Sequence, residues 1–183
     1  MKKWIIGALV GAIIMFVWQA ASWMFLNLHK DAGKYHPAQD SVVSYLSSVI
    51  TEDGAYMMPT GKPGSSMKDH QEMMKQMEGR PWVSIIYHKS FKDHMVMSMI
   101  RGFLVNFVIV LLLVVLLTKG GLPNFMGVLT GTLSVGVITF LWGPYMGHVW
   151  YDLPWEMISG DMLDAVVAWG LCGIWLGWWL NKK

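Results

Sequence analysis

Residues 67–77, MKDHQEMMKQM, combine methionine and histidine at a spacing that suits soft-metal chemistry. On a helix that turns about 100° per residue, Met67, His70, Met73, Met74 and Met77 fall within an arc of about 120°. The candidate metal ligands among them are Met67, His70, Met74 and Met77. Thioether and imidazole groups are good ligands for Cu(I). The stretch therefore predicts a Cu(I) or Ag(I) site, although no compact motif such as HxxxH or CxxC accompanies it.

The same methionine stripe also fits a helix that packs its apolar face. Methionine is flexible and a good helix former, so a row of methionines commonly fills a core or rests on a membrane surface. Packing is the favoured interpretation of residues 67–77, and copper is the one cofactor that the sequence suggests.

Three charged residues lie at the ends of apolar stretches: Arg101, Asp161 and Asp164. A charge at the edge of a bilayer is costly unless it is paired or reaches the interface. We expect an interhelical ion pair between Arg101 and Asp164, with Asp161 as the alternative acid. A structural clamp is favoured over a substrate or proton site, and an enzyme or transporter that uses Arg101, Asp164 and His148 is the weaker alternative.

Residues 143–161 form an outer segment that is rich in aromatic and polar side chains. The candidate patch consists of Tyr145, His148, Trp150, Asp152 and Trp155. Aromatic rings with polar tips suit the headgroup level of a membrane. His148 and Asp152 would face each other on a helix, but Pro144 and Pro154 argue against continuous helix. No nucleophile with a base and an orienting group is apparent, so the sequence favours a non-enzymatic protein.

Four apolar stretches must position these residues. Each is long enough to cross a bilayer, which takes about 20 helical residues. The predicted spans are 1–28, 95–118, 122–142 and 162–183, the last with a short cytoplasmic tail. With 54% hydrophobic and 14% charged residues, the chain is predicted to be an all-α membrane protein. The expected fold is a four-transmembrane-helix bundle with a small α+β extracytoplasmic module between helices 1 and 2.

The charges between the spans predict the orientation. The lysines that flank the spans on one side are Lys2, Lys3, Lys119, Lys182 and Lys183. Under the positive-inside rule, both termini and the turn 119–121 are cytoplasmic, whereas 29–94 and 143–161 face outward. We therefore expect a multi-pass protein of a bacterial cytoplasmic (inner) membrane. The net charge of +2 gives no reason to expect nucleic-acid binding.

The outer module 29–94 is predicted to fold without a disulfide, because Cys172 is the only cysteine and lies in the fourth span. The stretch PAQDSVVSYLSSVITEDG predicts a helix. GAYMMP and WVSIIYH predict two short strands that pair.

Glycines recur four residues apart in the spans. The pairs are Gly7 with Gly11, Gly127 with Gly131, and Gly173 with Gly177. In lipid, such pairs let helix backbones approach closely. They predict helix packing, either within the bundle or between copies.

Several stretches carry a likeness to known proteins: GAIIMFVWQAASWM, GAYMMP and WYDLPWEMISGDMLDAVVAWGLCGIWLG. They resemble a group of uncharacterised bacterial four-helix membrane proteins. The resemblance implies the topology and brings no assigned activity. The order of spans and loops is also that of claudins, but the paired cysteines of the claudin first loop are absent, so this is an analogy of topology.

These observations predict a non-enzymatic interaction or accessory protein. It would lie in the lipid bilayer and self-associate or join other membrane proteins in a larger complex. The alternative is an extracytoplasmic Cu(I)- or Ag(I)-binding membrane protein with methionine and histidine ligands.

Overall fold

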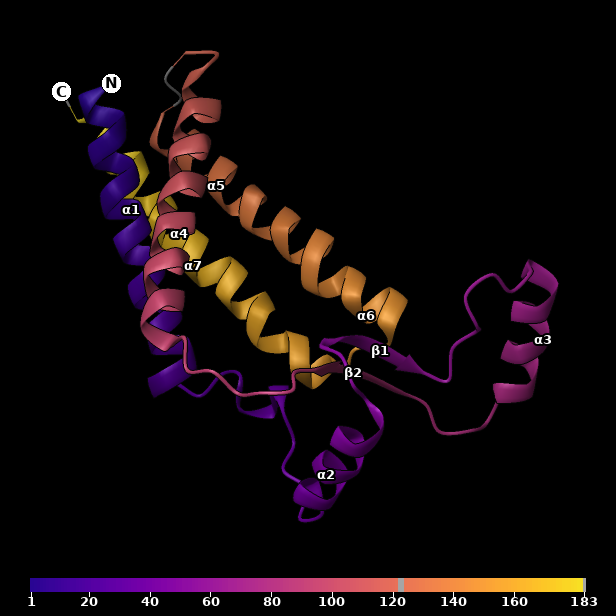
Figure 1. Cartoon of the computed structure of the whole chain (residues 1–183). Helices are drawn as coiled ribbons and strands as arrows, with labels where there is room; N and C mark the ends of the chain where they lie inside the picture. The colour runs from indigo at the N-terminus through magenta and orange to yellow at the C-terminus, as the bar shows by residue number, and fades with distance from the viewer. Residues whose placement is uncertain (122–123, 183) are drawn as a thin grey trace. The chain divides into compact units, whose positions relative to one another are not determined.

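The computed structural model describes residues 1–121 and 124–182, which form two compact units (Figure 1). Unit 1 comprises residues 1–34 and the chain from His94 onward, and unit 2 comprises residues 35–93. The predicted start of the third span at Leu122, and Lys183, lie outside the described residues.

Unit 1 is built from long helices. They are α1 (Lys2–Ala20), α4 (Met95–Thr118), α5 (Phe125–Phe140), α6 (Met146–Tyr151) and α7 (Trp155–Asn181). A π-helical turn, η1 (Ala21–Phe25), extends α1, and a second, η3 (Leu141–Tyr145), joins α5 to α6. Within the described residues, four continuous helical stretches are long and apolar enough to cross a membrane. This part of the fold prediction is confirmed.

The segment 143–161 is more helical than the sequence suggested. Pro144 does not end the third long helix, which continues through η3 and α6 as far as Tyr151. Pro144 has no N–H to donate, and in a regular α-helix its ring would clash with the carbonyl four residues earlier. The wider turn of a π-helix makes room for the ring, so the helix passes Pro144 with altered geometry. The fourth helix begins at Trp155, directly after Pro154, rather than at residue 162.

The long helices pack in the order α4, α1, α7, α5. Helix α1 lies against both α4 and α7, and α7 lies against α5. Helices α4 and α5 are consecutive in the chain, yet they contact each other only slightly. Apolar side chains that are fully buried between the helices include Val110, Val128, Cys172 and Leu176.

Two tryptophans join α7 to α1 at the end of the bundle that holds both termini (Figure 1). The indole N–H of Trp175 donates to the Gly7 carbonyl at 3.0 Å, and that of Trp179 donates to the Lys3 carbonyl at 2.7 Å. Backbone carbonyls near the start of a helix normally accept a hydrogen bond within the helix. Each indole N–H is therefore a second donor to a carbonyl of α1. They hold the two terminal helices side by side.

Most of the predicted packing glycines lie at contacts between helices of this chain. A Cβ atom added at Gly7, Gly11, Gly131, Gly173 or Gly177 would come within 3.0 Å of a side chain on another helix. Gly136, which the sequence analysis did not select, is tighter still, because its Cβ would lie 2.4 Å from the Ala165 carbonyl oxygen. Gly127 has a different role, since its N–H is capped by the Asn124 side chain at 2.8 Å.

Unit 2 contains two short helices and a two-stranded antiparallel sheet. Its elements are α2 (Gln39–Val49), β1 (Gly54–Met58), α3 (Met67–Met77) and β2 (Val83–Tyr87). In the sheet, Gly54 lies opposite Tyr87 and Met58 lies opposite Val83. Helix α3 coincides with the stretch MKDHQEMMKQM and begins at a capping box formed by Ser66 and Asp69.

Candidate functional site

A buried histidine meets an aspartate at the end of the bundle away from the termini. After η1, Asn27 adopts a left-handed conformation (φ 51°), and the 3₁₀ turn η2 (Lys30–Ala32) follows. This reversal directs His29 back onto α7, where its Nε2 lies 3.0 Å from Oδ2 of Asp164. His29 is only 7% exposed.

The surroundings of His29 fit its ring closely. Gly160 lies directly beside it, since an added Cβ there would be 2.7 Å from the ring Nδ1. On another side, the indole of Trp23 stacks on the imidazole with 4.1 Å between ring centroids and 4° between planes. The ring is therefore fixed by a glycine on α7 and an aromatic face from η1.

Asp164 uses both carboxylate oxygens. Oδ1 accepts a hydrogen bond of 2.8 Å from the indole N–H of Trp18, and Oδ2 faces His29. An ionised carboxylate can only accept hydrogen bonds, so His29 donates through Nε2. Asp164 thus connects the Trp18 and His29 side chains in one hydrogen-bond network. This network has a structural role, because it links α1, the turn after it and α7.

Asp161 lies about one helical turn before Asp164 on α7, and its contacts are different. Its carboxylate lies 3.9 Å from Nδ1 of His29, which is beyond hydrogen-bonding distance. Its side chain is 40% exposed, and it makes no hydrogen bond within the part of the chain that the structure describes. Asp161 is thus the acid of this site that is open to a further partner.

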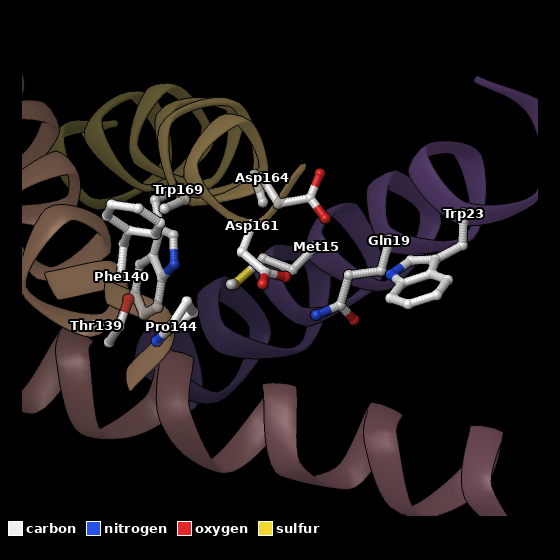
Figure 2. A pocket seen from close by; sticks show the side chains of 11 residues that line it. Met15, Gln19, Trp23, Thr139, Phe140, Pro144, Asp161, Asp164 and Trp169 are labelled. Carbon is white, nitrogen blue, oxygen red and sulfur yellow. The ribbon is translucent and has the colours of Figure 1, made fainter. Parts of the chain in front are cut away.

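The two carboxylates lie at a cavity of about 430 Å³ between α1, α7 and the α5–η3 junction. Figure 2 shows Gln19 and Trp23 at one end of this cavity and Phe140 and Trp169 at the other, with the carboxylates between them. Aromatic rings therefore stand at both ends of the cavity, and Gln19 is a polar side chain at the end toward α1. Such a volume falls in the range of small-molecule sites, which span about 300–1,000 Å³.

A second polar contact lies beside the cavity. Asn106 on α4 is buried and donates through Nδ2 to Oε1 of Gln19 on α1 at 2.8 Å. This hydrogen bond pairs one polar group of each amide in an apolar setting, where an unpaired amide is costly. The contact joins α4 to α1, which contributes Gln19 to the lining of the cavity.

The predicted pair between Arg101 and Asp164 is not formed. Arg101 is exposed and makes no ion pair or hydrogen bond with any residue between 1 and 121 or 124 and 182. The reason is the helix order, because α4 packs on α1 and not on α7. Both aspartates instead face His29.

The structure brings together part of the predicted aromatic and polar patch. The ring of His148 lies 6.0 Å from the rings of both Tyr145 and Trp155, measured between centroids. Its Nδ1 lies 2.6 Å from the Leu153 carbonyl, which makes this nitrogen the donor. No hydrogen bond or ion pair joins His148 to Asp152 in the described residues; Asp152 ends α6 in a left-handed conformation, and Trp150 is exposed.

The metal ligands predicted in α3 all come from one exposed helix. No residue of α3 is buried within the described residues, and Met67 and Met74 are 75% and 58% exposed. Met73 is half-buried. His70 is exposed and Met77 is half-buried. Among the residues that the structure describes, no three His, Cys, Asp or Glu side chains are placed to hold a metal ion.

Sequence reasoning did not select His29, Trp18 or Trp23 as site residues. The only sequence feature of His29 is its position just beyond the first apolar stretch. Its contact with Asp164 depends on a backbone reversal at Asn27 and on the space at Gly160, neither of which leaves a clear sequence signal.

No family model matches the chain, and no curated protein or solved structure is significantly similar to it. Its function is therefore inferred from the geometry of its own residues.

Proposed function

We propose that the four long helices span a bacterial cytoplasmic membrane, with both termini in the cytoplasm and an α+β module outside. The lengths and apolar character of the helices support insertion. The lysines near the ends of the spans support the orientation. Cysteines placed at Ser65 and Lys119 test it with a membrane-impermeant maleimide. Position 65 should react from outside, and position 119 only after the membrane is permeabilised; the reverse pattern would contradict the orientation.

Within this membrane, we propose that the protein is a non-enzymatic interaction or accessory subunit that presents α4 to another membrane helix. The observation that carries this proposal is the outward face of α4, defined as Arg101, Leu104, Val105, Val108 and Leu112. These positions share one side of a helix by their spacing. The four apolar side chains are each more than half exposed.

The opposite side of α4 is used within the chain. Asn106, Val110, Leu113 and Val114 are buried and face the bundle. Within the described part of unit 1, α4 packs mainly on α1 and contacts α5 only slightly, so no helix of this unit covers its outward face. A helix held on one side only can accept a second helix without any rearrangement of the bundle.

Arg101 distinguishes the outward face of α4 from an ordinary lipid-facing surface. Lipid-facing positions rarely carry a charge, and an intramembrane arginine normally pairs or reaches the interface. The described residues offer Arg101 no ion pair, so a partner helix with an acidic or carbonyl group would complete it. The packing glycines, by contrast, already contact helices of the same chain.

Site-specific photocrosslinking in native membranes tests this association. A photoreactive phenylalanine derivative at Leu112 should give a defined protein adduct, and Arg101→Gln should reduce it. The matched control is the same group at Ile174, which is similarly exposed on α7. An adduct of twice the chain mass shows self-association, and another mass shows a larger complex. Equal adducts at 112 and 174, or none at either, would contradict the proposal.

A second candidate function is extracytoplasmic Cu(I) or Ag(I) binding by α3. The observation that favours it is the exposure of Met67, His70 and Met74 on a helix fixed by its own cap. The wild-type chain should compete with a chromogenic chelator for Cu(I). A variant in which these three residues and Met77 are replaced together should not. A variant that replaces the exposed Met24 and Met126 instead is the control, and unchanged Cu(I) stoichiometry in the fourfold variant would reject the site.

A further inference from the structure

The cavity between α1, α7 and the α5–η3 junction combines three features that a structural void does not need. It holds a carboxylate without a hydrogen-bond partner, it has aromatic walls, and it is large enough for a small molecule. Asp164 is already satisfied by Trp18 and His29, so the unused capacity belongs to Asp161.

When both acids are ionised, the summed charge of Asp161, Asp164 and His29 is negative whether or not His29 is protonated. Asp161 and Asp164 contribute two carboxylates, and His29 contributes at most one positive charge. No lysine or arginine side chain lines this cavity in the described residues. A bound cation would therefore offset an unbalanced charge that is otherwise costly in an apolar setting.

The walls decide which kind of cation fits. Trp23, Phe140 and Trp169 line the cavity together with the side chain of Met15. Aromatic faces attract ammonium groups through their negative quadrupole, and apolar side chains accommodate the substituents of such a group. A metal ion would need several oxygen ligands converging on one point, whereas the cavity supplies two carboxylates, one of them fully engaged.

We propose that this cavity binds an ammonium group that carries an apolar substituent, with Asp161 as its counter-charge. The ammonium lies against Asp161, and its apolar substituent extends toward the aromatic rings of Phe140 and Trp169 (Figure 2). The ammonium can belong to the headgroup of a membrane lipid or to a free organic amine. This site is independent of the association through α4.

Isothermal titration of the full chain in an uncharged maltoside detergent tests the proposal with benzyltrimethylammonium as the probe. Benzyl alcohol, which has the same ring without the charge, is the control ligand. The wild-type chain should bind the cation at one site and should not bind benzyl alcohol measurably. Asp161→Asn should weaken binding about tenfold or more, as expected for the loss of a charge-assisted contact.

Two variants make the result specific to Asp161. Asp161→Glu keeps the charge and should retain binding. Asp152→Asn removes a carboxylate that does not line the cavity, at a left-handed position that asparagine tolerates, and should bind like the wild type. Both variants, and Asp161→Asn, should elute from a sizing column as the wild type does.

Native mass spectrometry of the chain released from its membrane distinguishes the two sources of the ammonium. One phosphatidylethanolamine retained by the wild type and lost in Asp161→Asn identifies a lipid headgroup. Binding of benzyltrimethylammonium without a retained lipid identifies a free amine. Absence of both, or equal behaviour of Asp161→Asn and the wild type, would overturn the proposal. The adduct at position 112 should be unaffected by Asp161→Asn, so the two proposals fail separately.

Discussion

Nε2 of His29 lies 3.0 Å from Oδ2 of Asp164, although 135 positions separate the two residues in the chain. This contact ties the turn after the first long helix to the last one. Together with the indole of Trp18, it fixes one carboxylate in a bridging role and leaves Asp161 facing the cavity. Two acids on neighbouring turns of α7 therefore have different tasks.

That difference predicts unequal stability effects. Asp164→Ala removes the acceptor of both Trp18 and His29 and should destabilise unit 1 by about 1–3 kcal/mol for each buried donor left unpaired. Asp161→Ala removes no hydrogen bond and should cost less. Circular dichroism of the purified variants during heating in detergent measures the order of their transitions. Equal transition temperatures for the two variants would contradict the bridging role.

Gly136 predicts a second stability effect. Gly136→Ala would place a Cβ 2.4 Å from the Ala165 carbonyl oxygen, so α5 and α7 must separate. Overpacking of this kind costs about 1–3 kcal/mol. The matched control is Gly102→Ala on α4, which meets nothing within 4 Å and should be neutral or slightly stabilising. Circular dichroism during heating in detergent compares their unfolding temperatures, and a Gly136→Ala chain as stable as Gly102→Ala would argue against this close approach.

Asp53 predicts a pH dependence in unit 2. The backbone N–H of Lys89, and then the ring of His88, lower the pKa of Asp53 below its ordinary value of 3.8. Stabilisation from a lowered pKa is fully present above the ordinary value and is lost as the pH falls through the lowered pKa. In the ¹⁵N-lysine-labelled chain, the Lys89 amide signal should titrate with a midpoint below 3.8. A midpoint at or above 3.8, or the same titration in Asp53→Asn, would exclude this contact.

The capping box of α3 predicts a local effect of Ser66→Ala. The Ser66 hydroxyl accepts from the Asp69 N–H at 3.2 Å, and the Asp69 carboxylate accepts from the Ser66 N–H at 3.0 Å. Loss of an N-cap costs about 1 kcal/mol, so α3 should exchange its amide hydrogens faster. Hydrogen-exchange mass spectrometry of residues 67–77 measures this. Ser66→Asp should preserve protection, and unchanged exchange in Ser66→Ala would show that the cap does not hold α3.

The long helices could be predicted from the sequence because continuous apolar length decides them locally. The second span, predicted at 95–118, coincides with α4. Their extensions could not be predicted, because Pro144 is accommodated by a π-turn and because the aromatic segment from Trp155 joins α7. Local composition did not distinguish these helical turns from a loop.

The partners of the charged residues could not be predicted, because apolar length does not specify which helices are neighbours. Charge and depth favoured Arg101 as the partner of Asp164, whereas α4 packs on α1. The actual partner, His29, reaches α7 through a left-handed residue and a 3₁₀ turn. That contact depends on tertiary structure, which residue spacing alone does not encode.

Association of α4 with another membrane helix is the central feature of the proposed function. The decisive measurement is native mass spectrometry of the chain extracted in polymer-bounded discs of its own membrane. We predict a species heavier than the single chain of 20.7 kDa, which Leu112→Trp reduces to the single chain and Ile174→Trp does not. A wild-type chain found only at 20.7 kDa would contradict association through α4.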